Sequence, residues 1–539
     1  MIQSLMMSMP LNIATLIQHA DRHHGSVEIV SRRVEGDLHR TTYRELHRRA
    51  RQLANALASL GIGPGDRVAT LAWNGYRHLE LYFAVSGSGA VLHTINPRLH
   101  PEQIGWIARH AGDKVLFFDS CFGPLAQAVR RTAPQVRHFV AMTDRDRMAD
   151  AGPEPALCYE ELLEASTDAF EWPALDETTA SSMCYTSGTT GDPKGVLYSH
   201  RSTVLHSLAC ALPDAFNLSS RDTVLPVVPM FHVNAWGLPY AAPMVGARLV
   251  LPGARLDGPS LYELFEAEGV TMSAGVPTVW QGLVAHLEAN GLKLSTLQRM
   301  VIGGAACAPS MLQRLQDRGV QVLHAWGMTE MSPLGTVCSL KASQLNLTPS
   351  EQLAIRSRQG RVLYPVDMKV VDEQGQELPW DGNSSGDLMV RGPWVASEYF
   401  QGGSALRDGW FSTGDVANID QEGFMRITDR SKDVIKSGGE WISSIELECI
   451  ALSHPGVANA ACIAVAHPKW GERPLLVIVC KSGQTVTREQ VLAHFADKVA
   501  RWQVPDDVVF VDAIPLGATG KMLKGQLRER FREHRWPGA

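Results

Sequence analysis

The chain has 539 residues, more than one hydrophobic core normally serves, so we expect at least two domains. Hydrophobic residues make up 45% of the sequence and charged residues 20%, which is typical of a globular protein. The net charge of −6 provides no polycationic surface, so we expect no nucleic-acid partner. The nine cysteines are scattered without a CxxC pair, which favours reduced thiols over disulfides or a zinc site. Because the N-terminus also lacks a basic leader, the sequence predicts a cytoplasmic location.

The first part of the chain alternates helical and strand patterns. Thr42 and Glu45 have the spacing of a capping box, and an apolar stripe at positions 46, 50, 53, 54, 57 and 60 predicts the helix that follows. Short apolar runs predict strands at 67–73, 91–95, 115–118, 139–142, 182–185, 248–251, 300–302 and 320–323. Strands that alternate with helices indicate largely parallel sheets, and hence an α/β fold.

One stretch, residues 223–247, contains no charged side chain and is long enough to span a membrane. It also contains Pro226, Pro229, Pro239 and Pro243, which would leave helix carbonyls unpaired in lipid. We therefore predict no transmembrane segment, and interpret this stretch as buried polypeptide that lines an apolar site.

The pattern changes after about residue 366. Short strands at 368–371, 387–391 and 423–428, with tight turns between them, predict a small β-rich subdomain. Beyond residue 429, strands at 460–465, 475–480 and 508–512 and a helix at 488–500 predict a further α+β unit. We therefore predict an α/β protein with a large N-terminal domain, residues 1–431, and a small C-terminal domain, residues 432–539.

The strongest local signal is the segment 185–195, which reads YTSGTTGDPKG and follows a predicted strand. Glycines let backbone N–H groups curl around an anion, the Ser and Thr hydroxyls add donors, and the lysine adds positive charge. The spacing differs from that of a Walker A loop. The segment therefore predicts a phosphate-binding loop of another kind, with an ordinary Gly/Ser/Thr surface loop as the alternative.

This segment resembles the phosphate-loop signature of the adenylate-forming superfamily, which includes acyl-CoA synthetases, firefly luciferase and the adenylation domains of peptide synthetases. Further matches follow in the family's order at FHVNAWG (231–237), GGAA (303–306), WGMTE (326–330), STGD (412–415), DRSKDVIKSGGEWIS (429–443) and PLGATGK (515–521). The likeness covers about residues 40–525 and is greatest to bacterial medium-chain fatty-acyl-CoA ligases and methylmercaptopropionate-CoA ligases. It implies that ATP activates a carboxylic acid as acyl-AMP and that the acyl group then passes to coenzyme A.

The resemblance implies roles for residues along the ATP site. Thr186 and Glu330 resemble the neighbours of a catalytic Mg²⁺, a hard cation that takes oxygen ligands. The β- and γ-phosphates would be held by Ser187, Gly188, Thr189, Thr190, Gly191 and Lys194. The nucleoside would contact Gly303, Gly304, Ala305, Ala325, Trp326, Gly327, Met328 and Thr329, with Asp415 on the ribose hydroxyls and Arg430 as an added donor.

The resemblance also implies an acyl site and two alternating C-terminal elements. His232 would guide the carboxylate, although a lone histidine is more often a hydrogen-bonded core residue, and Val233, Trp236 and Gly327 would form the acyl wall. Lys521 resembles the catalytic lysine that bridges the carboxylate and the α-phosphate, and Lys432 lies at the hinge of a mobile C-terminal domain. The loop that replaces Lys521 for the coenzyme A step would be Ser437, Gly438, Gly439, Glu440 and Trp441.

Several alternatives stay open within this resemblance. The substrate could be an aliphatic acid, with medium-chain fatty acids favoured, or a short thioether acid such as 3-methylmercaptopropionate. An amino-acid adenylation domain is disfavoured because FHVNAWG contains no Asp to pair with a substrate ammonium. A luciferase-like oxygenase shares the first half-reaction, and a catalytically silent scaffold is disfavoured because Lys521 and Glu330 are both present. The resemblance also implies a homodimer.

Overall fold

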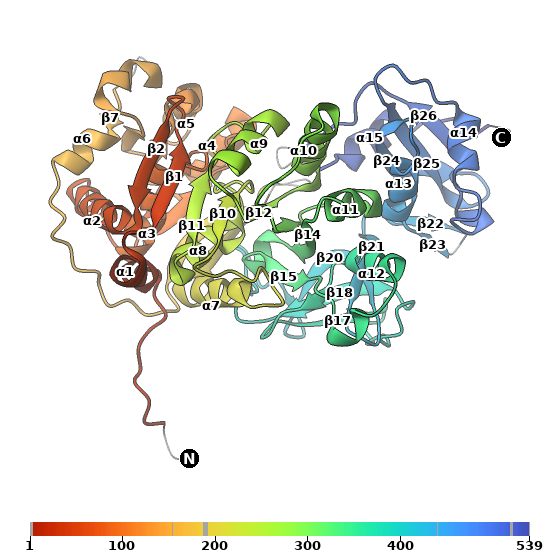
Figure 1. Cartoon of the computed structure of the whole chain (residues 1–539), viewed down its shortest axis with the longest axis horizontal. Coiled ribbons are helices and arrows are strands. Elements are labelled where there is room, and N and C mark those ends of the chain that lie inside the picture. Colours follow the sequence, from red (N-terminus) through yellow and green to blue (C-terminus); the bar gives the residue numbers. More distant parts are fainter. Residues whose placement is uncertain (1–3, 153–154, 187–191, 439, 518–520, 538–539) are drawn as a thin grey trace. The chain divides into compact units, whose positions relative to one another are not determined.

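The computed structural model describes residues 4–152, 155–186, 192–438, 440–517 and 521–537 (Figure 1). The chain divides into two compact units. Unit 1 comprises Met1–Val301, Gly327–Gly335 and Gly392–Ala405, and unit 2 comprises Ile302–Trp326, Thr336–Arg391 and Leu406–Ala539. Within the described ranges, every helix is too short or too polar to cross a membrane.

The first sheet of unit 1 has seven strands in the order β7-β6-β5-β3-β4-β8-β9. Their bounds are β3 (Arg67–Leu71), β4 (Val91–Thr94), β5 (Val115–Phe118), β6 (His138–Ala141), β7 (Leu157–Cys158), β8 (Ala180–Tyr185) and β9 (Gly195–Ser199). Neighbouring strands run parallel except for β8 and β9, which form an antiparallel hairpin. Ligands of α/β sheets bind beyond the carboxyl ends of the parallel strands, and β8 brings Thr186 to that edge.

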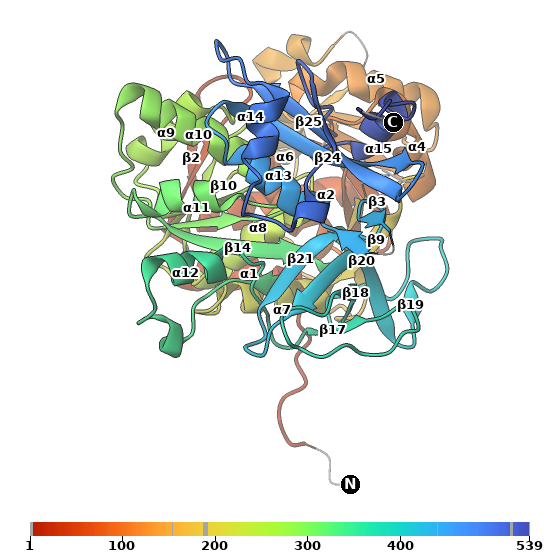
Figure 2. The ribbon, with the colours of Figure 1, turned by 90° about the vertical axis from the view of Figure 1, so that its right-hand side faces the viewer.

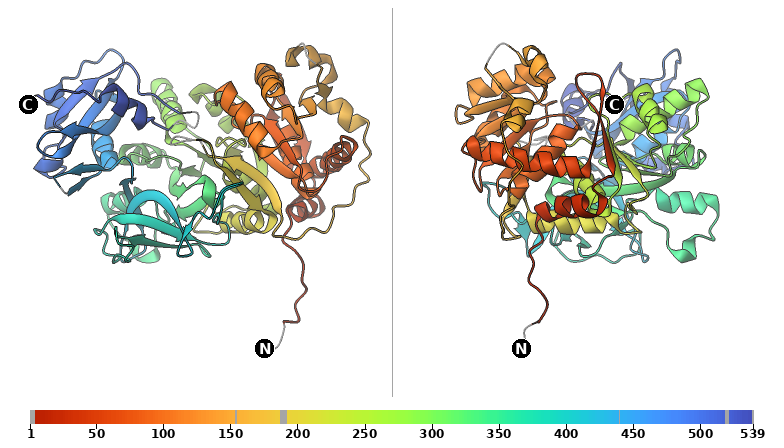
Figure 3. Two further views of the ribbon diagram at one scale, coloured as in Figure 1. Left: turned by 180° about the vertical axis from the view of Figure 1, so that it is seen from behind. Right: turned by 60° about the vertical axis from the view of Figure 1, so that its left-hand side comes forward.

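Helices cover both faces of this sheet (Figure 3). Their bounds are α2 (Tyr43–Ser59), α3 (Tyr76–Gly87), α4 (Pro101–Ala111), α5 (Gly123–Thr132) and α6 (Tyr159–Glu164). Alternate residues of β3 face opposite helix layers, because Leu71 packs in one core with α4 and α5 while the Thr70 hydroxyl contacts His78 of α3 at 3.0 Å. The predicted helix after Thr42 is present, but its capping box is only half formed. Thr42 Oγ1 accepts a hydrogen bond from Glu45 N, whereas the Glu45 carboxylate binds Arg48.

A second sheet of unit 1 contains consecutive strands β12-β10-β11-β1-β2. The strands are β1 (Glu28–Arg32), β2 (Leu38–Thr42), β10 (Thr223–Pro226), β11 (Arg248–Leu251) and β12 (Met272–Gly275), and the nearby helices are α1 (Ile13–His24), α7 (His200–Ala211), α8 (Leu238–Val245), α9 (Gly258–Ala267) and α10 (Pro277–Asn290). The uncharged stretch 223–247 forms β10, the short turn η3 (Val233–Gly237) and α8. Most of its side chains are buried, which confirms that it is interior polypeptide.

The chain continues with β13 (Arg299–Ile302), α11 (Pro309–Gln316), β14 (Gln321–Gly327), β15 (Leu334–Val337), α12 (Pro349–Arg356) and β16 (Arg361–Val362). In unit 2 a separate antiparallel sheet then has the order β17-β18-β20-β19, with β21 also paired to β20 (Figure 2). Its strands are β17 (Asp367–Val371), β18 (Gly386–Arg391), β19 (Leu406–Arg407), β20 (Trp410–Ile419) and β21 (Met425–Arg430). The predicted β-rich subdomain is therefore confirmed.

The C-terminal part of unit 2 has its own sheet, with the order β23-β22-β25-β24 and β26 paired to β25. Its elements are β22 (Ile435–Ser437), β23 (Glu440–Ile442), α13 (Ser444–Leu452), β24 (Val457–His467), β25 (Gly471–Cys480), α14 (Arg488–Ala493), β26 (Asp507–Phe510) and α15 (Lys524–Arg530).

The predicted helix at 488–500 is wrong in length. It ends at Ala493, because the backbone beyond it forms tighter i to i+3 hydrogen bonds, such as Phe495 N to Leu492 O at 3.1 Å, and Asp497 adopts a φ of 61°. The α/β class with a small C-terminal α+β unit is confirmed, while the boundary between residues 431 and 432 stays a prediction.

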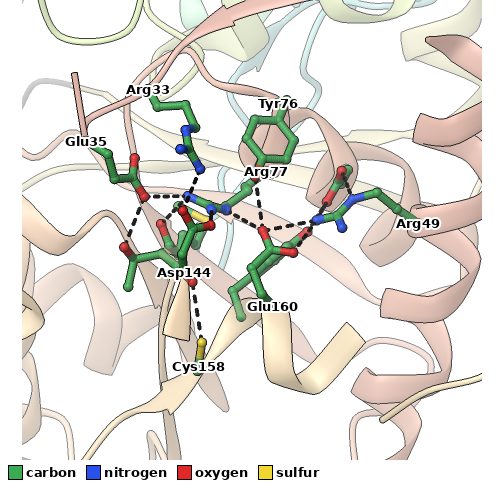
Figure 4. A network of polar contacts seen from close by, with 12 residues as sticks. Arg33, Glu35, Arg49, Tyr76, Arg77, Asp144, Cys158 and Glu160 are labelled. Carbon is green, nitrogen blue, oxygen red and sulfur yellow. Dashed lines mark hydrogen bonds and ion pairs between the residues drawn. The ribbon is translucent and has the colours of Figure 1, made fainter. Parts of the chain in front are cut away.

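A buried network of charged side chains ties the two sheets of unit 1 together (Figure 4). Arg77 on α3 is 4% exposed, and its guanidinium contacts Glu35 at 2.8 Å, Glu160 at 2.7 Å and Asp144. Glu160 also pairs with Arg49 of α2 at 3.0 Å. Burial alone would raise the pKa of Glu160, but Arg49 and Arg77 outweigh it and lower that pKa. One arginine therefore joins the β1–β2 turn to α3, α6 and the end of β6.

We predict that Arg77→Met lowers the free energy of unfolding by about 3–5 kcal/mol at pH 7, because it leaves buried carboxylates without their cation. The folded-state pKa of Glu160 lies below its unfolded value of 4.5, so its contribution is present above that pH and is lost as the pH falls through the folded pKa. The difference in the free energy of unfolding between Arg77→Met and the wild type should therefore become smaller as the pH falls. Urea unfolding at pH 7 and pH 4 measures both effects. Arg145→Met is the control, since Arg145 is 82% exposed and its ion pair contributes little; equal losses in both variants would contradict the prediction.

Candidate active site

The base of the predicted phosphate loop is closed by two hydrogen bonds. Thr186 N donates to Lys194 O at 2.9 Å, and Lys194 N donates to Thr186 Oγ1 at 3.1 Å. Residues Ser187, Gly188, Thr189, Thr190 and Gly191, which were predicted to bind phosphates, lie outside the described residues. Gly195 follows in the hairpin, where a Cβ would lie 3.1 Å from both the Tyr185 ring and Phe400. The hairpin therefore presents Thr186 and Lys194 side by side.

Glu330 lies against this hairpin. It is 6% exposed, and its Oε1 accepts a hydrogen bond from Tyr399 OH at 2.7 Å. The neighbouring Thr329 carbonyl accepts one from Tyr198 OH of β9 at 2.7 Å. The chain reaches this position through Gly327, where a Cβ would lie only 1.9 Å from Pro333 O. Lys194 Nζ lies 4.7 Å from the centre of the Tyr399 ring, so the side chains predicted to bind metal and phosphate share one cluster.

The predicted acyl segment, residues 231–237, contains a left-handed turn. Val233, Asn234, Ala235, Trp236 and Gly237 all have positive φ, between 44° and 80°. A non-glycine residue in this conformation costs roughly 1–2 kcal/mol. Strain of this kind persists only where the surroundings hold it, and it is concentrated at functional sites.

Strand β8 holds this turn. Asn234 Nδ2 donates to Ser182 Oγ at 2.9 Å, and its Oδ1 lies 3.7 Å from the Cys184 sulfur. Ser182 and Cys184 precede Thr186 on the strand that enters the phosphate loop. His232 is half-buried and Trp236 is buried. The acyl segment is therefore fixed beside the base of the phosphate loop.

Asn74, which the sequence analysis did not identify, clamps the chain just before this turn. Its Nδ2 donates to Pro226 O at 2.8 Å and to Val228 O at 2.9 Å, while its Oδ1 accepts from Met230 N at 2.7 Å. Tyr82 OH also donates to Met230 O. In the sequence, Asn followed by Gly indicates only a turn, so nothing in the local pattern could reveal this long-range clamp.

The predicted nucleoside residues Trp326, Asp415 and Arg430 lie together in unit 2. Asp415 is 3% exposed, its Oδ2 accepts from Trp326 Nε1 at 2.9 Å, and its Oδ1 lies 3.1 Å from Arg430 Nε. The register of β20 and β21 places Asp415 directly opposite Arg430. Gly303, Gly304 and Ala305 directly follow β13, and Ala325 precedes Trp326 on β14. The fifteen-residue separation of Asp415 and Arg430 is therefore spanned by a hairpin.

The C-terminal candidates are also placed in unit 2. The Lys521 carbonyl accepts a hydrogen bond from Gly517 N at 2.7 Å, and Leu516 pairs with Met522. Lys432 is exposed, and the next residue, Asp433, is anchored to Arg528 of α15 at 2.6 Å.

The predicted coenzyme A loop is the turn between β22 and β23. Gly438 has a φ of 61°, and its N–H donates to Trp470 O at 2.8 Å. Glu440 is exposed and Trp441 is partly buried, whereas Gly439 lies outside the described residues. Ser437 is buried, and its Oγ accepts from Arg473 at 3.0 Å, so this hydroxyl is engaged within the C-terminal sheet.

Comparison with protein families gives two matches along the chain. Residues 16–400 match the family described as AMP-binding enzyme, and residues 446–521 match the AMP-binding enzyme C-terminal domain. The chain belongs to the AMP-binding enzyme family. This confirms the resemblance to adenylate-forming enzymes.

Two proteins of similar sequence support the assignment of the chain to this family, and one solved structure supports the fold. The chain is 54% identical to the medium-chain-fatty-acid–CoA ligase of Ectopseudomonas oleovorans, covering 98% of this chain and 97% of the relative. It is 55% identical to the 3-methylmercaptopropionyl-CoA ligase of Ruegeria lacuscaerulensis, covering 98% of each. The crystal structure of an anthranilate CoA ligase with anthranoyl-AMP has the same fold, with a TM-score of 0.86 at 24% identity over 97% of this chain and 98% of that one.

We predict that Asn74→Ala loosens the acyl segment and destabilises the protein. Each buried backbone group that it leaves unpaired costs about 1–3 kcal/mol, so the total loss should be about 3 kcal/mol or more. Hydrogen exchange should rise first in residues 226–237. Asn55→Ala is the control, since the Asn55 amide also donates to two carbonyls, Thr167 O and Ala169 O, but in an exposed position. Faster exchange spread evenly over the protein would contradict a local clamp.

Proposed function

We propose that this acyl-CoA ligase of the AMP-binding family acts on an uncharged aliphatic acid of medium chain length. The observation that carries the proposal is the hydrogen bond from Asn234 to Ser182, which fixes the uncharged acyl segment to the strand entering the phosphate loop. The acyl chain would lie against buried apolar side chains of 223–247, and its carboxylate would reach the ATP phosphates. An ammonium or second carboxylate there would lose its hydration without gaining a partner.

The reaction has two group transfers. A carboxylate oxygen attacks the α-phosphorus of ATP, the bond between the α-phosphorus and the bridging oxygen breaks, and pyrophosphate leaves. The thiol of coenzyme A then loses its proton and attacks the acyl carbonyl, and AMP leaves as the mixed anhydride breaks. Two anions must meet in the first step, so oriented donors and positive charge near the α-phosphate lower its barrier.

We assign the first step to the residues that the family resemblance implies, because their side chains are of the types that can supply these donors and charges. Lys194 and the loop from Ser187 to Gly191 hold the outer phosphates, His232 orients the carboxylate, and Lys521 stabilises charge on the α-phosphate. Asp415 accepts hydrogen bonds from the ribose, with Arg430 beside it. The base would lie along Gly303, Gly304, Ala305, Ala325, Trp326, Gly327, Met328 and Thr329.

Mg²⁺ fits the oxygen ligands of this cluster. Glu330 supplies a carboxylate and Thr186 a hydroxyl, which are the donor types that Mg²⁺ prefers. Within the described ranges no three His, Cys, Asp or Glu side chains are grouped to bind a metal by themselves. Phosphate oxygens and water would therefore complete the coordination shell. When bound, the ion would neutralise phosphate charge.

For the second step we propose that the C-terminal domain, residues 432–539, rotates at Lys432. Lys521 and the loop Ser437, Gly438, Gly439, Glu440 and Trp441 lie on this one domain and serve different half-reactions. Glycine at positions 438 and 439 lets the pantetheine arm approach the backbone. We also propose that the protein is a homodimer, which light scattering would test. We propose a cytoplasmic location, because the nine free cysteines fit a reducing compartment.

We predict that Lys521→Ala lowers acyl-AMP formation by ~10²-fold or more, as for other lost electrostatic stabilisers of a transition state. Thioester formation from supplied acyl-AMP should fall far less. Acid-dependent pyrophosphate release measures the first step and thioester formation measures the second. Equal losses in both would remove Lys521 from the adenylation step.

The substrate is tested with straight-chain acids from C2 to C16. Each methylene in apolar contact contributes about 0.8 kcal/mol, so kcat/KM should rise about fourfold per methylene until the pocket ends, with the maximum at medium length. Trp236→Ala should change this preference and leave the KM for ATP unchanged. Pentanoate and 3-methylmercaptopropionate form a matched pair that differs only in CH₂ against sulfur, and a strong preference for the latter would assign the thioether acid instead. A preference for amino acids or dicarboxylates would refute the proposal.

A further inference from the structure

The segment from Ala396 to Gln401 crosses the proposed phosphate and metal site, although no predicted site residue lies in it. Ala396 N donates to Glu330 O at 2.7 Å, and Phe400 N donates to Gly195 O at 2.8 Å. Gln401 also reaches His110 O at 3.4 Å. Backbone hydrogen bonds on both sides therefore fix the position of Tyr399 between Glu330 and the base of the phosphate loop.

The Tyr399 side chain contacts two residues of opposite charge. Its hydroxyl donates to Glu330 Oε1 at 2.7 Å, and Lys194 Nζ lies 4.7 Å from its ring centre. A phenol hydroxyl carries its proton at neutral pH and an ionised carboxylate can only accept, so the Tyr399 hydroxyl is the donor in this hydrogen bond. The ring face attracts the ammonium through the π-electron quadrupole.

Glu330 and Lys194 would otherwise attract each other. In the part of the chain that the structure describes, no ion pair joins them, and Tyr399 contacts each separately. A direct pair would occupy the carboxylate and the ammonium with one another. Mg²⁺ and the phosphates could then bind only by breaking that pair.

We propose that Tyr399 is a positioning residue for MgATP. It orients the Glu330 carboxylate by one oxygen, and it holds the Lys194 ammonium over its ring, so that both charges face the incoming ligand unpaired. This inference rests on the proposed function, in which Glu330 binds the metal and Lys194 binds phosphate.

Two substitutions separate the two contacts. Tyr399→Phe removes the hydroxyl but keeps the ring, so the Mg²⁺ concentration for half-maximal pyrophosphate release should rise about tenfold, the effect of one hydrogen bond to a charged group. The KM for ATP at saturating Mg²⁺ should change little. Tyr399→Leu removes the ring as well, and should raise that KM a further roughly threefold, the effect of an exposed cation–π contact.

A double-mutant cycle distinguishes this inference from the function on which it rests. If Tyr399 acts through the carboxylate, Tyr399→Phe should add almost nothing to the Mg²⁺ shift of Glu330→Gln. The inference about Tyr399 would be overturned if Glu330→Gln shifted the Mg²⁺ titration and Tyr399→Phe did not, or if the two shifts simply added in the double mutant. Either result would leave the proposed function intact. An unchanged Mg²⁺ titration in Glu330→Gln would instead remove Glu330 from the metal site.

A matched control comes from a second tyrosine–glutamate hydrogen bond in unit 1, which lies away from the proposed site. Tyr159 OH donates to Glu80 at 2.5 Å, and Glu80 also pairs with Arg49 at 2.6 Å. Tyr159→Phe therefore also removes a Tyr–Glu hydrogen bond, one that is more deeply buried and lies away from the site. It should lower the thermal midpoint and leave the Mg²⁺ titration unchanged. If Tyr159→Phe shifted the Mg²⁺ titration as far as Tyr399→Phe does, both shifts would be explained by a general loss of rigidity, and the positioning role of Tyr399 would be refuted.

Discussion

The hydrogen bond from Asn234 to Ser182 joins two stretches that lie 52 residues apart, and the proposed chemistry depends on it. Ser182 lies on the strand that leads to Thr186, and Asn234 lies in the segment that follows His232. Activation of an acid requires its carboxylate to meet a triphosphate of the same sign, and charge repulsion opposes that meeting. In the proposed mechanism, a fixed distance between residues 231–237 and the base of the phosphate loop would let binding energy overcome this repulsion before the reaction begins.

That fixed distance requires strain in the acyl segment. Four non-glycine residues, Val233 to Trp236, adopt left-handed backbone conformations that are unfavourable by themselves. The clamp of Asn74 before the turn, and the contacts of Asn234 within it, hold the chain in place. The surrounding structure therefore stabilises a conformation that the local sequence disfavours, which is typical of functional sites.

Charges in unit 1 are arranged in two contrasting ways. In the network around Arg77, carboxylates and guanidinium groups pair directly, which stabilises the junction of the two sheets. At Tyr399, a neutral hydroxyl and an aromatic face contact Glu330 and Lys194 instead. Direct pairing suits a structural role because the charges satisfy one another. A neutral contact would suit the proposed MgATP site, because both charges would stay available to the ligand.

The sequence by itself determined the fold class and the family, because strand and helix periodicity and short glycine-rich motifs depend on neighbouring residues. The family resemblance also placed Asp415 and Arg430 at the ribose, and the structure shows why they meet, since they lie opposite each other on adjacent strands of one hairpin. The sequence missed Asn74 and Tyr399 and mistook the end of the helix that begins at Arg488, where the chain turns at Asp497 with a φ of 61°. These features were decided by tertiary structure alone. The partners of Asn74 and Tyr399 lie far away in the chain, and the energy of a buried hydrogen bond or an apolar contact depends on which distant groups meet, which no local pattern encodes.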